Sequence, residues 1–343
     1  MNVSKKIFLR LGPKFIGIVI AVLLALILIL GIYQVFLKPS DNDNKLPSSG
    51  LTENEDEENG NTDNIDSDNP PTPEQPTAPV YSLNNAVTVT TPLSSQAAVL
   101  CNNSENTVIL RKSESSPLPS APVLGLATAL AVMNSIESGE ISPSDRAVCP
   151  ASAIRLPCYE KNSGILSVGQ SLTVAEMVKT MLCAESPELF AYTLAVHICG
   201  NEQAFVNRLN TLLKNIGTTA TVFTTVSDSA KQTSTALDAA IIFRATTENS
   251  TLLTLLSSRE SFTVSAGGNA WSTVTLCGRF YSECCTEGQA KADGIICGYY
   301  GEYDGNQYVF MLFEQLGIKY LTAAINSATA YADSLILLSN ATR

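Results

Sequence analysis

The pattern of apolar and polar positions divides the chain into three parts. Residues 15–37 form one apolar run, residues 38–80 contain almost no large apolar side chains, and residues 81–343 mix apolar runs with turn-forming segments. About 20 apolar residues in a helix cross the hydrocarbon core of a bilayer. A segment as polar as 38–80 cannot bury enough surface to fold. The pattern therefore predicts a cytoplasmic N-terminus over 1–14, a transmembrane signal anchor over 15–37, a disordered acidic, proline-rich linker over 38–80 and a folded domain over 81–343.

Within the folded domain, the periodicities indicate both strands and helices. Residues 95–113 contain two β-rich runs around the turn-forming segment NNSEN, which predicts a hairpin. Helices are predicted over 122–137, 172–184, 187–199, 202–215, 235–246 and 318–336, and strands over 261–266, 272–277, 294–300 and 307–313. A hairpin, a block of helices, further strands and a terminal helix predict an α/β domain of the α+β type, in which helices cover an antiparallel sheet.

The charge distribution bears on the orientation and the partners of the chain. Residues 1–37 carry four basic residues and no acidic one, whereas residues 38–80 carry eleven acidic and two basic residues. Basic residues on the amino side of an apolar run favour a cytoplasmic N-terminus and an exported remainder. The run is too long for the core of a cleaved signal peptide. No clustered basic face is evident, so we expect no nucleic-acid partner.

The cysteines and the histidine give no indication of a metal or a cofactor. All nine cysteines lie between residues 101 and 297, none of them forms a C-x-x-C pair, and His197 is the only histidine. Metal sites built from cysteine and histidine need such clusters, so we expect neither a metal nor a cofactor. Outside the cytosol some of these cysteines could pair as disulfides, with at least one left over. They are equally compatible with small core residues.

The order of several segments resembles a known family. Residues 108–133, VILRKSESSPLPSAPVLGLATALAVM, resemble without a gap the segment around the nucleophile of the D-alanyl-D-alanine carboxypeptidases. These are the low-molecular-weight penicillin-binding proteins, serine peptidases of family S11. Residues 139–148, 166–182, 191–223 and 233–242 resemble the family segments that follow, in the same order. The resemblance implies a β-lactamase/transpeptidase-like fold over nearly all of residues 95–340, and a bacterial cell-membrane protein with this domain outside the cytoplasm.

The first family motif lacks its reactive side chains. An acyl-enzyme hydrolase of this kind needs a nucleophilic serine and, one helical turn later, a lysine that accepts the hydroxyl proton. The gapless match puts Pro122 at the serine position and Gly125 at the lysine position. Neither residue can attack a carbonyl or take a proton, and no S-x-x-K occurs anywhere in the chain. Ser120, just before the predicted helix, is the alternative nucleophile, although a helix cap is its simpler role.

The resemblance also locates two further motifs, and both are altered. The family's S-x-N, whose side chains line the cleft, falls on Ser186 and Glu188, so the serine is present and the asparagine is not. Helix N-capping is the simpler role for Ser186. The family's K-T-G, on a strand at the cleft edge, falls near Thr286, Glu287 and Gly288. An acidic residue there would repel the substrate carboxylate.

These observations lead to two functional hypotheses. The main one is a membrane-anchored extracytoplasmic protein with the carboxypeptidase fold that is catalytically inactive and binds a peptidoglycan stem peptide or a cell-wall protein partner. The alternative is an active serine-type D-Ala-D-Ala carboxypeptidase that remodels peptidoglycan with a non-standard nucleophile. Loss of both the nucleophile and its base at Pro122 and Gly125 favours the first, because it removes the covalent route.

Overall fold

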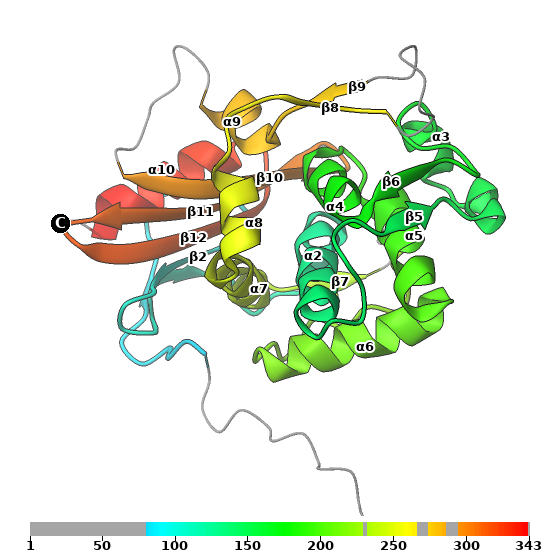
Figure 1. Ribbon diagram of the computed structural model, residues 1–343. Helices are drawn as coiled ribbons and strands as arrows, with labels where there is room; N and C mark the ends of the chain where they lie inside the picture. The colour runs from blue at the N-terminus through cyan, green and yellow to red at the C-terminus, as the bar shows by residue number, and fades with distance from the viewer. Residues whose placement is uncertain (1–79, 229–231, 266–273, 286–293, 342–343) are drawn as a thin grey trace, which may run out of the picture. The chain divides into compact units, whose positions relative to one another are not determined.

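A six-stranded sheet forms one side of the domain, with its strands in the order β1-β3-β2-β12-β11-β10 (Figure 1). The computed structural model describes residues 80–228, 232–265, 274–285 and 294–341. The strands are β1 (Val87–Thr88), β2 (Ala97–Asn102), β3 (Thr107–Lys112), β10 (Ile295–Tyr303), β11 (Asn306–Gln315) and β12 (Ile318–Ser327). All neighbouring pairs are antiparallel except β1 with β3. The predicted α/β fold with a largely antiparallel sheet is confirmed.

The hairpin predicted over 95–113 is β2 and β3, which pair with Leu100 opposite Leu110. The helix predicted over 318–336 is wrong, because this segment begins with strand β12 and only then continues into α10 (Ala330–Ala341). Leu316 and Gly317, with φ of 53° and 79°, make the two-residue turn that returns β11 into β12. The middle of β12 is buried on both faces, so its apolar run has no alternation that would distinguish it from a helix.

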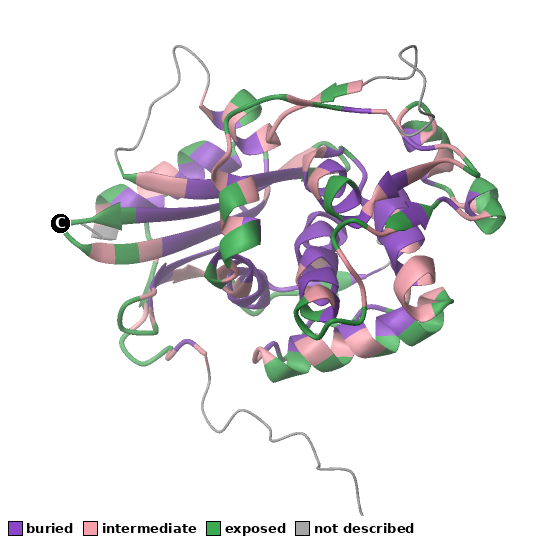
Figure 2. Ribbon diagram, in the orientation of Figure 1, coloured by how far each residue is buried: buried purple, intermediate pink, exposed green. Residues whose placement is uncertain are grey.

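Successive residues of the sheet face two hydrophobic cores. On β2, Val99 and Cys101 belong to the larger core, whereas Ala98 and Leu100 belong to the smaller one. The larger core also contains the buried faces of the helical block, and the smaller one contains the inner face of α10. Figure 2 shows the central strands and one helix of the block, α2 (Ala121–Glu137), buried along most of their length. Burial on both sides holds the sheet and α2 in fixed positions, which makes them suitable walls for a site.

Most predicted helices are present within a few residues of their expected ends. They are α2, α4 (Val174–Cys183), α5 (Glu188–Cys199), α6 (Glu202–Asn215) and α7 (Ala236–Glu248). Thr173 caps α4 in a capping box with Glu176. The apolar spacing did not predict the short helices α3 (Tyr159–Asn162), α8 (Ser250–Ser257) and α9 (Arg279–Cys284). Three further pairs of short strands form small sheets of their own. They are β4 (Leu118–Pro119) with β7 (Thr233–Ser234), β5 (Arg146–Val148) with β6 (Ser171–Thr173), and β8 (Phe262–Val264) with β9 (Val274–Leu276).

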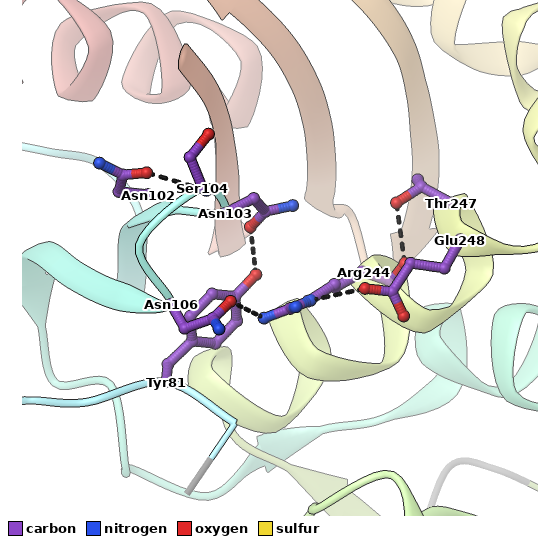
Figure 3. Close-up of polar contacts among 8 residues, drawn as sticks. All are labelled: Tyr81, Asn102, Asn103, Ser104, Asn106, Arg244, Thr247 and Glu248. Atoms are coloured by element: carbon purple, nitrogen blue, oxygen red, sulfur yellow. Dashed lines mark hydrogen bonds and ion pairs between the residues drawn. The ribbon is translucent and has the colours of Figure 1, made fainter.

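A cluster of polar contacts holds the first described residues against the domain (Figure 3). Tyr81 donates its hydroxyl proton to Asn103 in the β2–β3 turn, and the guanidinium of Arg244 from α7 lies 5.2 Å from the centre of the Tyr81 ring. Arg244 also donates to Asn106 at 2.7 Å and to Glu248 at 2.8 Å. Burial raises the pKa of Tyr81, so its hydroxyl remains a donor. This cluster joins the start of the domain to the sheet and to α7.

The predicted N-terminal segments 1–14 and 15–37, and all of the linker 38–80 except its last residue, lie outside the described residues. Among the residues that the structure describes, no helix has both the length and the apolar character needed to cross a membrane. All nine cysteines fall within the described ranges, and within those ranges no disulfide joins any two of them.

Candidate functional site

A cavity of about 740 Å³ opens where the first turn of α2, the start of α5 and the end of β10 meet. Its walls come from six separate segments of the chain, which the fold brings together. The lining residues are Ala121, Pro122, Pro157, Cys158, Lys161, Ala184, Glu185, Ser186, Pro187, Glu188, Ser227, Asp228, Arg279, Tyr299, Gly301, Glu302, Tyr303 and Asp304. The predicted site residues Pro122, Ser186 and Glu188 therefore lie around one cavity.

The start of α2 is held from outside the helix. Strand β4 pairs with β7, and the backbone N–H of Ser120 donates to the carbonyl of Gln232 at 2.9 Å. Pro122 lies in the first turn, where its missing N–H has no cost. Ser120 precedes the helix, but its hydroxyl makes no capping bond, is buried without a hydrogen-bond partner and does not line the cavity. The alternative nucleophile Ser120 is thus turned away from the space where a substrate would bind.

Pro122 is packed directly against the edge strand of the sheet. A Cβ atom added to Gly301 on β10 would lie 2.5 Å from the Cβ of Pro122. Carbon atoms in contact are normally 3.5–4.0 Å apart, so only a glycine allows the strand to approach the helix this closely. Pro122 and Gly301 are therefore complementary in shape, with no reactive group between them.

Gly125, one turn further along α2, is surrounded in a similar way. A Cβ atom on Gly125 would lie 3.1 Å from the hydroxyl oxygen of Tyr299 and 3.4 Å from the Cβ of Pro187. Tyr299 is only 4% exposed, and burial raises the pKa of its hydroxyl, so the ring carries no charge. The space in which a longer side chain at position 125 would extend is taken by Tyr299 and Pro187.

Ser186 and Glu188 form a polar pair in the cavity wall. The hydroxyl of Ser186 donates to the carboxylate of Glu188, and the side-chain amide of Asn162 donates to the carbonyl of Ser186 at 3.0 Å. The N-cap of α5 is Pro187, and no side chain caps this helix. The expectation that Ser186 acts as a helix cap is therefore wrong. Its hydroxyl bonds to the side chain of Glu188, two residues further along the chain, rather than to the helix backbone.

The charges around the cavity are predominantly negative. Five lining residues are acidic, namely Glu185, Glu188, Asp228, Glu302 and Asp304, and two are basic, namely Lys161 and Arg279. The guanidinium of Arg279 lies 3.7 Å from the carboxylate of Glu302 and 4.8 Å from the centre of the Tyr300 ring. Burial, reinforced by Glu302, raises the pKa of Tyr300 to about 12. Arg279 is the basic side chain fixed at the β10 edge of the cavity, where acidic residues surround it.

Cys158 is the thiol that lines the cavity, but its environment disfavours the reactive form. Burial and then the charge of Glu188 raise its pKa to about 12, and the thiol donates to the carbonyl of Ser227 at 3.9 Å. A thiolate is the nucleophilic form of cysteine, so at neutral pH Cys158 is almost entirely unreactive. His197, near the end of α5, does not line the cavity and supplies no base to Cys158 or Ser186.

Several lining residues were not found from the sequence. The positions predicted for the third motif, Thr286, Glu287 and Gly288, lie outside the described residues. Among the strands that the structure describes, β10 borders the cavity, through Tyr299, Gly301 and Glu302. A glycine inside an apolar strand signals a close approach of another backbone, and this signal at Gly301 could have identified β10. Lys161 and Arg279 belong to short helices without a sequence pattern that points to a site.

Comparison with known families gives the decisive observation. The sequence model of the D-alanyl-D-alanine carboxypeptidase family, peptidase S11, matches residues 84–298, which is well over half of the chain. The chain belongs to this family. The match includes α2, α5 and the first four of the nine residues of β10, and it ends just before Tyr299, the first residue of β10 that lines the cavity. The family resemblance of the ordered sequence segments is confirmed.

Individual relatives are distant in sequence and similar in fold. D-alanyl-D-alanine carboxypeptidase DacF of Bacillus subtilis is 26% identical over 132 residues, which are 37% of this chain and about a third (32%) of DacF. Among solved structures, the D-alanyl-D-alanine carboxypeptidase of Mycobacterium tuberculosis matches with a TM-score of 0.59 at 17% identity, covering 73% of this chain and 90% of that one. Penicillin-binding protein 6B of Escherichia coli matches with a TM-score of 0.61 at 16% identity, covering 79% and 81%. These structures share the fold of this S11 domain.

Proposed function

We propose that this S11 family member is a catalytically inactive, membrane-anchored protein of the bacterial cell envelope. Residues 15–37 anchor it, residues 38–80 act as a tether, and the S11 domain outside the cytoplasm binds a peptidoglycan stem peptide or a cell-wall protein partner without cleaving it. The names of the relatives support an origin in D-Ala-D-Ala chemistry. The bases before the apolar run and the acids after it support the orientation.

The observation that carries this proposal is the packing around Pro122 and Gly125. A covalent serine mechanism needs a hydroxyl and a nearby amine in the first turns of α2. Here the first position is a proline fitted against Gly301, and the space beside the second is filled by Tyr299 and Pro187. The walls of the cavity have thus adapted to the two substitutions, which is expected of a cavity that no longer performs the reaction.

The third motif supports the same conclusion once it is placed on β10. The family's K-T-G lies on a strand at the cleft edge, and within the described residues β10 is the strand that contributes to the cavity. We assign this motif to Tyr299, Tyr300 and Gly301, instead of residues 286–288. The glycine is retained, but tyrosines replace the lysine and the threonine. Arg279, whose guanidinium stacks on Tyr300, is then the cation left at this edge to receive a ligand carboxylate.

One observation favours the alternative of an active enzyme with a non-standard nucleophile. Ser186 lines the cavity, and its hydroxyl is bonded to a carboxylate, that of Glu188. A carboxylate is a much weaker base towards a hydroxyl than an amine or an imidazole, because its conjugate acid normally has a pKa near 4. The Ser186–Glu188 pair is therefore a poor substitute for a serine–lysine pair, and the inactive assignment is the stronger of the two.

The test is to incubate the full-length protein, purified in detergent, with a stem pentapeptide that ends in D-Ala-D-Ala. We expect binding in calorimetry and no release of D-alanine. Replacing Arg279 by glutamine should weaken binding about 10- to 100-fold, because a hydrogen bond to a charged group is lost. Arg208→Gln, which removes a cation on α6 paired with Glu140 outside the cavity, is the matched control and should bind normally.

The outcomes separate the two hypotheses and the two ligands. Release of D-alanine that Ser186→Ala abolishes would establish the active enzyme and reject the proposal. Binding without release, weakened only by the Arg279 substitution, would establish the stem peptide as the ligand. If the peptide does not bind, the protein should be cross-linked in cells, once through the cavity wall near Arg279 and once through the surface of α6. An envelope protein that is captured only through the wall near Arg279 would establish the protein partner. Absence of both would reject a binding role.

A further inference from the structure

Two half-buried thiols closely precede two of the six chain segments that form the walls of the cavity. Cys183 is the last residue of α4, and Cys277 follows the last residue of β9. Four of the other cysteines, Cys101, Cys149, Cys284 and Cys297, are at most 2% exposed. Cys183 and Cys277 are partly exposed, as are Cys199 on α5 and Cys285 at the end of α9. Cys183 and Cys277 are thus less deeply buried than the cysteines of the core.

The fold brings together the segments that carry these two thiols. The ammonium of Lys179 on α4 lies 4.0 Å from the centre of the Phe262 ring on β8, and Phe262 pairs with Leu276 on β9. Cys183 is four residues after Lys179, so it lies on the same face of α4. Cys277 directly follows Leu276. The face of α4 that carries Cys183 is thus turned towards the β8–β9 ribbon, at the end where Cys277 leaves it.

Two further observations agree with this placement. Cys183 and Gly278, the neighbour of Cys277, line the same small cavity between α4, α8 and α9. Burial raises the pKa of Cys183 to about 12, and a negative charge on Cys277 contributes to this increase. The contribution of Cys277 agrees with this placement, because the interaction between two charges weakens as their separation grows.

We propose that Cys183 and Cys277 are a modification site: under oxidising conditions they form a disulfide that ties together two of the segments that form the walls of the cavity. Residues 184–188 follow Cys183 directly and contribute Ser186 and Glu188 to one wall. Gly278 and Arg279 follow Cys277 directly, and Arg279 also lines the cavity, from a different segment of the chain. A bond between the thiols would fix the distance between Ser186 and Arg279 without adding any group to the cavity. In the cell, the bond depends on the proposed export of the domain, because disulfides persist in oxidising compartments.

The oxidation is an exchange with a disulfide-containing oxidant, for which glutathione disulfide is the probe. One of the two cysteine thiolates attacks a sulfur of the oxidant, forms a mixed disulfide and releases the first glutathione as a thiol. The second cysteine, after losing its proton, attacks the protein sulfur of the mixed disulfide and releases the second glutathione. The pair of thiols loses two electrons and two protons, and the oxidant is reduced to two thiols. Because the pKa of Cys183 is about 12, the exchange should accelerate as the pH rises from 7 to 9.

The experiment maps the disulfides of the full-length protein in detergent after incubation with oxidised and reduced glutathione. Remaining thiols are alkylated, and the digested protein is analysed by mass spectrometry. The expected result is a peptide pair joined through Cys183 and Cys277, lost in Cys183→Ser and in Cys277→Ser and kept in the control Cys199→Ser. The oxidised form should melt at a temperature on the order of 5–15 °C higher than the reduced form, because the disulfide closes a long loop.

A parallel sample oxidised in 8 M urea as a denaturant distinguishes a bond that the fold directs from random pairing. In the unfolded chain, Cys277 should pair mostly with its neighbours in sequence, Cys284 and Cys285, because short loops close more easily. The proposal is overturned if the native protein gives this same pattern, or if Cys183 and Cys277 each end as a mixed disulfide with glutathione. The mapping of the unmodified sequence is decisive even if a serine variant fails to fold.

Discussion

Gly125 is the residue at which the packing of the cavity excludes the family's chemistry most directly. Serine has one side-chain heavy atom fewer than proline, so replacing Pro122 by serine would add no bulk to the first turn of α2. A lysine at position 125 would have to pass Tyr299 and Pro187, whose atoms already lie 3.1 and 3.4 Å from an added Cβ. The nucleophile is thus missing through a single change of side chain, whereas the base is missing because other residues fill its place.

We therefore expect that Gly125→Lys destabilises the protein by about 2–4 kcal/mol, because the added atoms overpack the site and the ammonium loses hydration. Urea unfolding measures this loss. Gly164→Lys is the control, since no atom lies within 4 Å of an added Cβ there, and it should change stability by less than about 0.5 kcal/mol. In a double-mutant cycle, Tyr299→Ala should cost less stability in the Gly125→Lys protein than in the original one. Equal stability of Gly125→Lys and the original protein would show that the cavity still accepts a lysine.

Gly301 and Pro122 give a second measure of the same fit. Gly301→Ala should lower the free energy of unfolding by about 1–3 kcal/mol, because the new methyl group would lie 2.5 Å from the Cβ of Pro122. Pro122→Gly removes that Cβ, so in a double-mutant cycle the two substitutions should couple favourably by at least about 0.5 kcal/mol. Additive effects of the two changes would mean that β10 does not pack on the first turn of α2 as described.

Elements with regular sequence periodicity were predictable, and those that depend on turns or on burial from both sides were not. Helices α2, α4, α5, α6 and α7 follow the apolar spacing and their capping residues. Strand β12 was taken for a helix, because the Leu316–Gly317 turn before it was not recognised and its middle is buried on both faces. Periodicity distinguishes strand from helix only where one side faces water.

Helix α6 also supports a loop beside the cavity, and this contact makes a pH-dependent prediction. Glu202, in the first turn of α6, accepts hydrogen bonds from the backbone N–H groups of Val226 and Ser227 at 2.8 and 2.9 Å. Burial raises the pKa of Glu202, but the bonds from the side chains of Thr225 and Ser227 and from these N–H groups outweigh burial, so its pKa lies below the usual value.

A lowered pKa in the folded state stabilises the protein above the unfolded-state pKa, near 4.3, and this contribution is lost as the pH falls through the folded-state value. Glu202→Gln should therefore unfold at lower urea concentration than the original protein at pH 7, and the difference should shrink progressively below about pH 4. Glu260→Gln, at an exposed position, is the control and should show little difference at either pH. A difference for Glu202→Gln that stays constant down to pH 3 would contradict this role for the carboxylate.

At the scale of the whole molecule, the cavity combines positions that the sequence could identify with others that only the fold brings together. The motif positions Pro122, Ser186 and Glu188 were found through the family resemblance, and the structure places them around one cavity. Arg279 and Tyr299 were not found, because their place at the cavity depends on how β10 and α9 cross the end of α2. Contacts between segments more than 150 residues apart leave no local pattern in a single sequence.

The most direct test of the inactive assignment is covalent labelling of the full-length protein with a fluorescent penicillin, measured by gel fluorescence. β-Lactams form stable acyl-enzymes with the nucleophilic serine of this family, and an active carboxypeptidase of the same family is the positive control. Because Pro122 has no hydroxyl and Ser186 has no adequate base, we predict no labelling above that of the heat-denatured protein. Stable labelling that Ser186→Ala or Ser120→Ala abolishes would show an acylated serine and contradict the account.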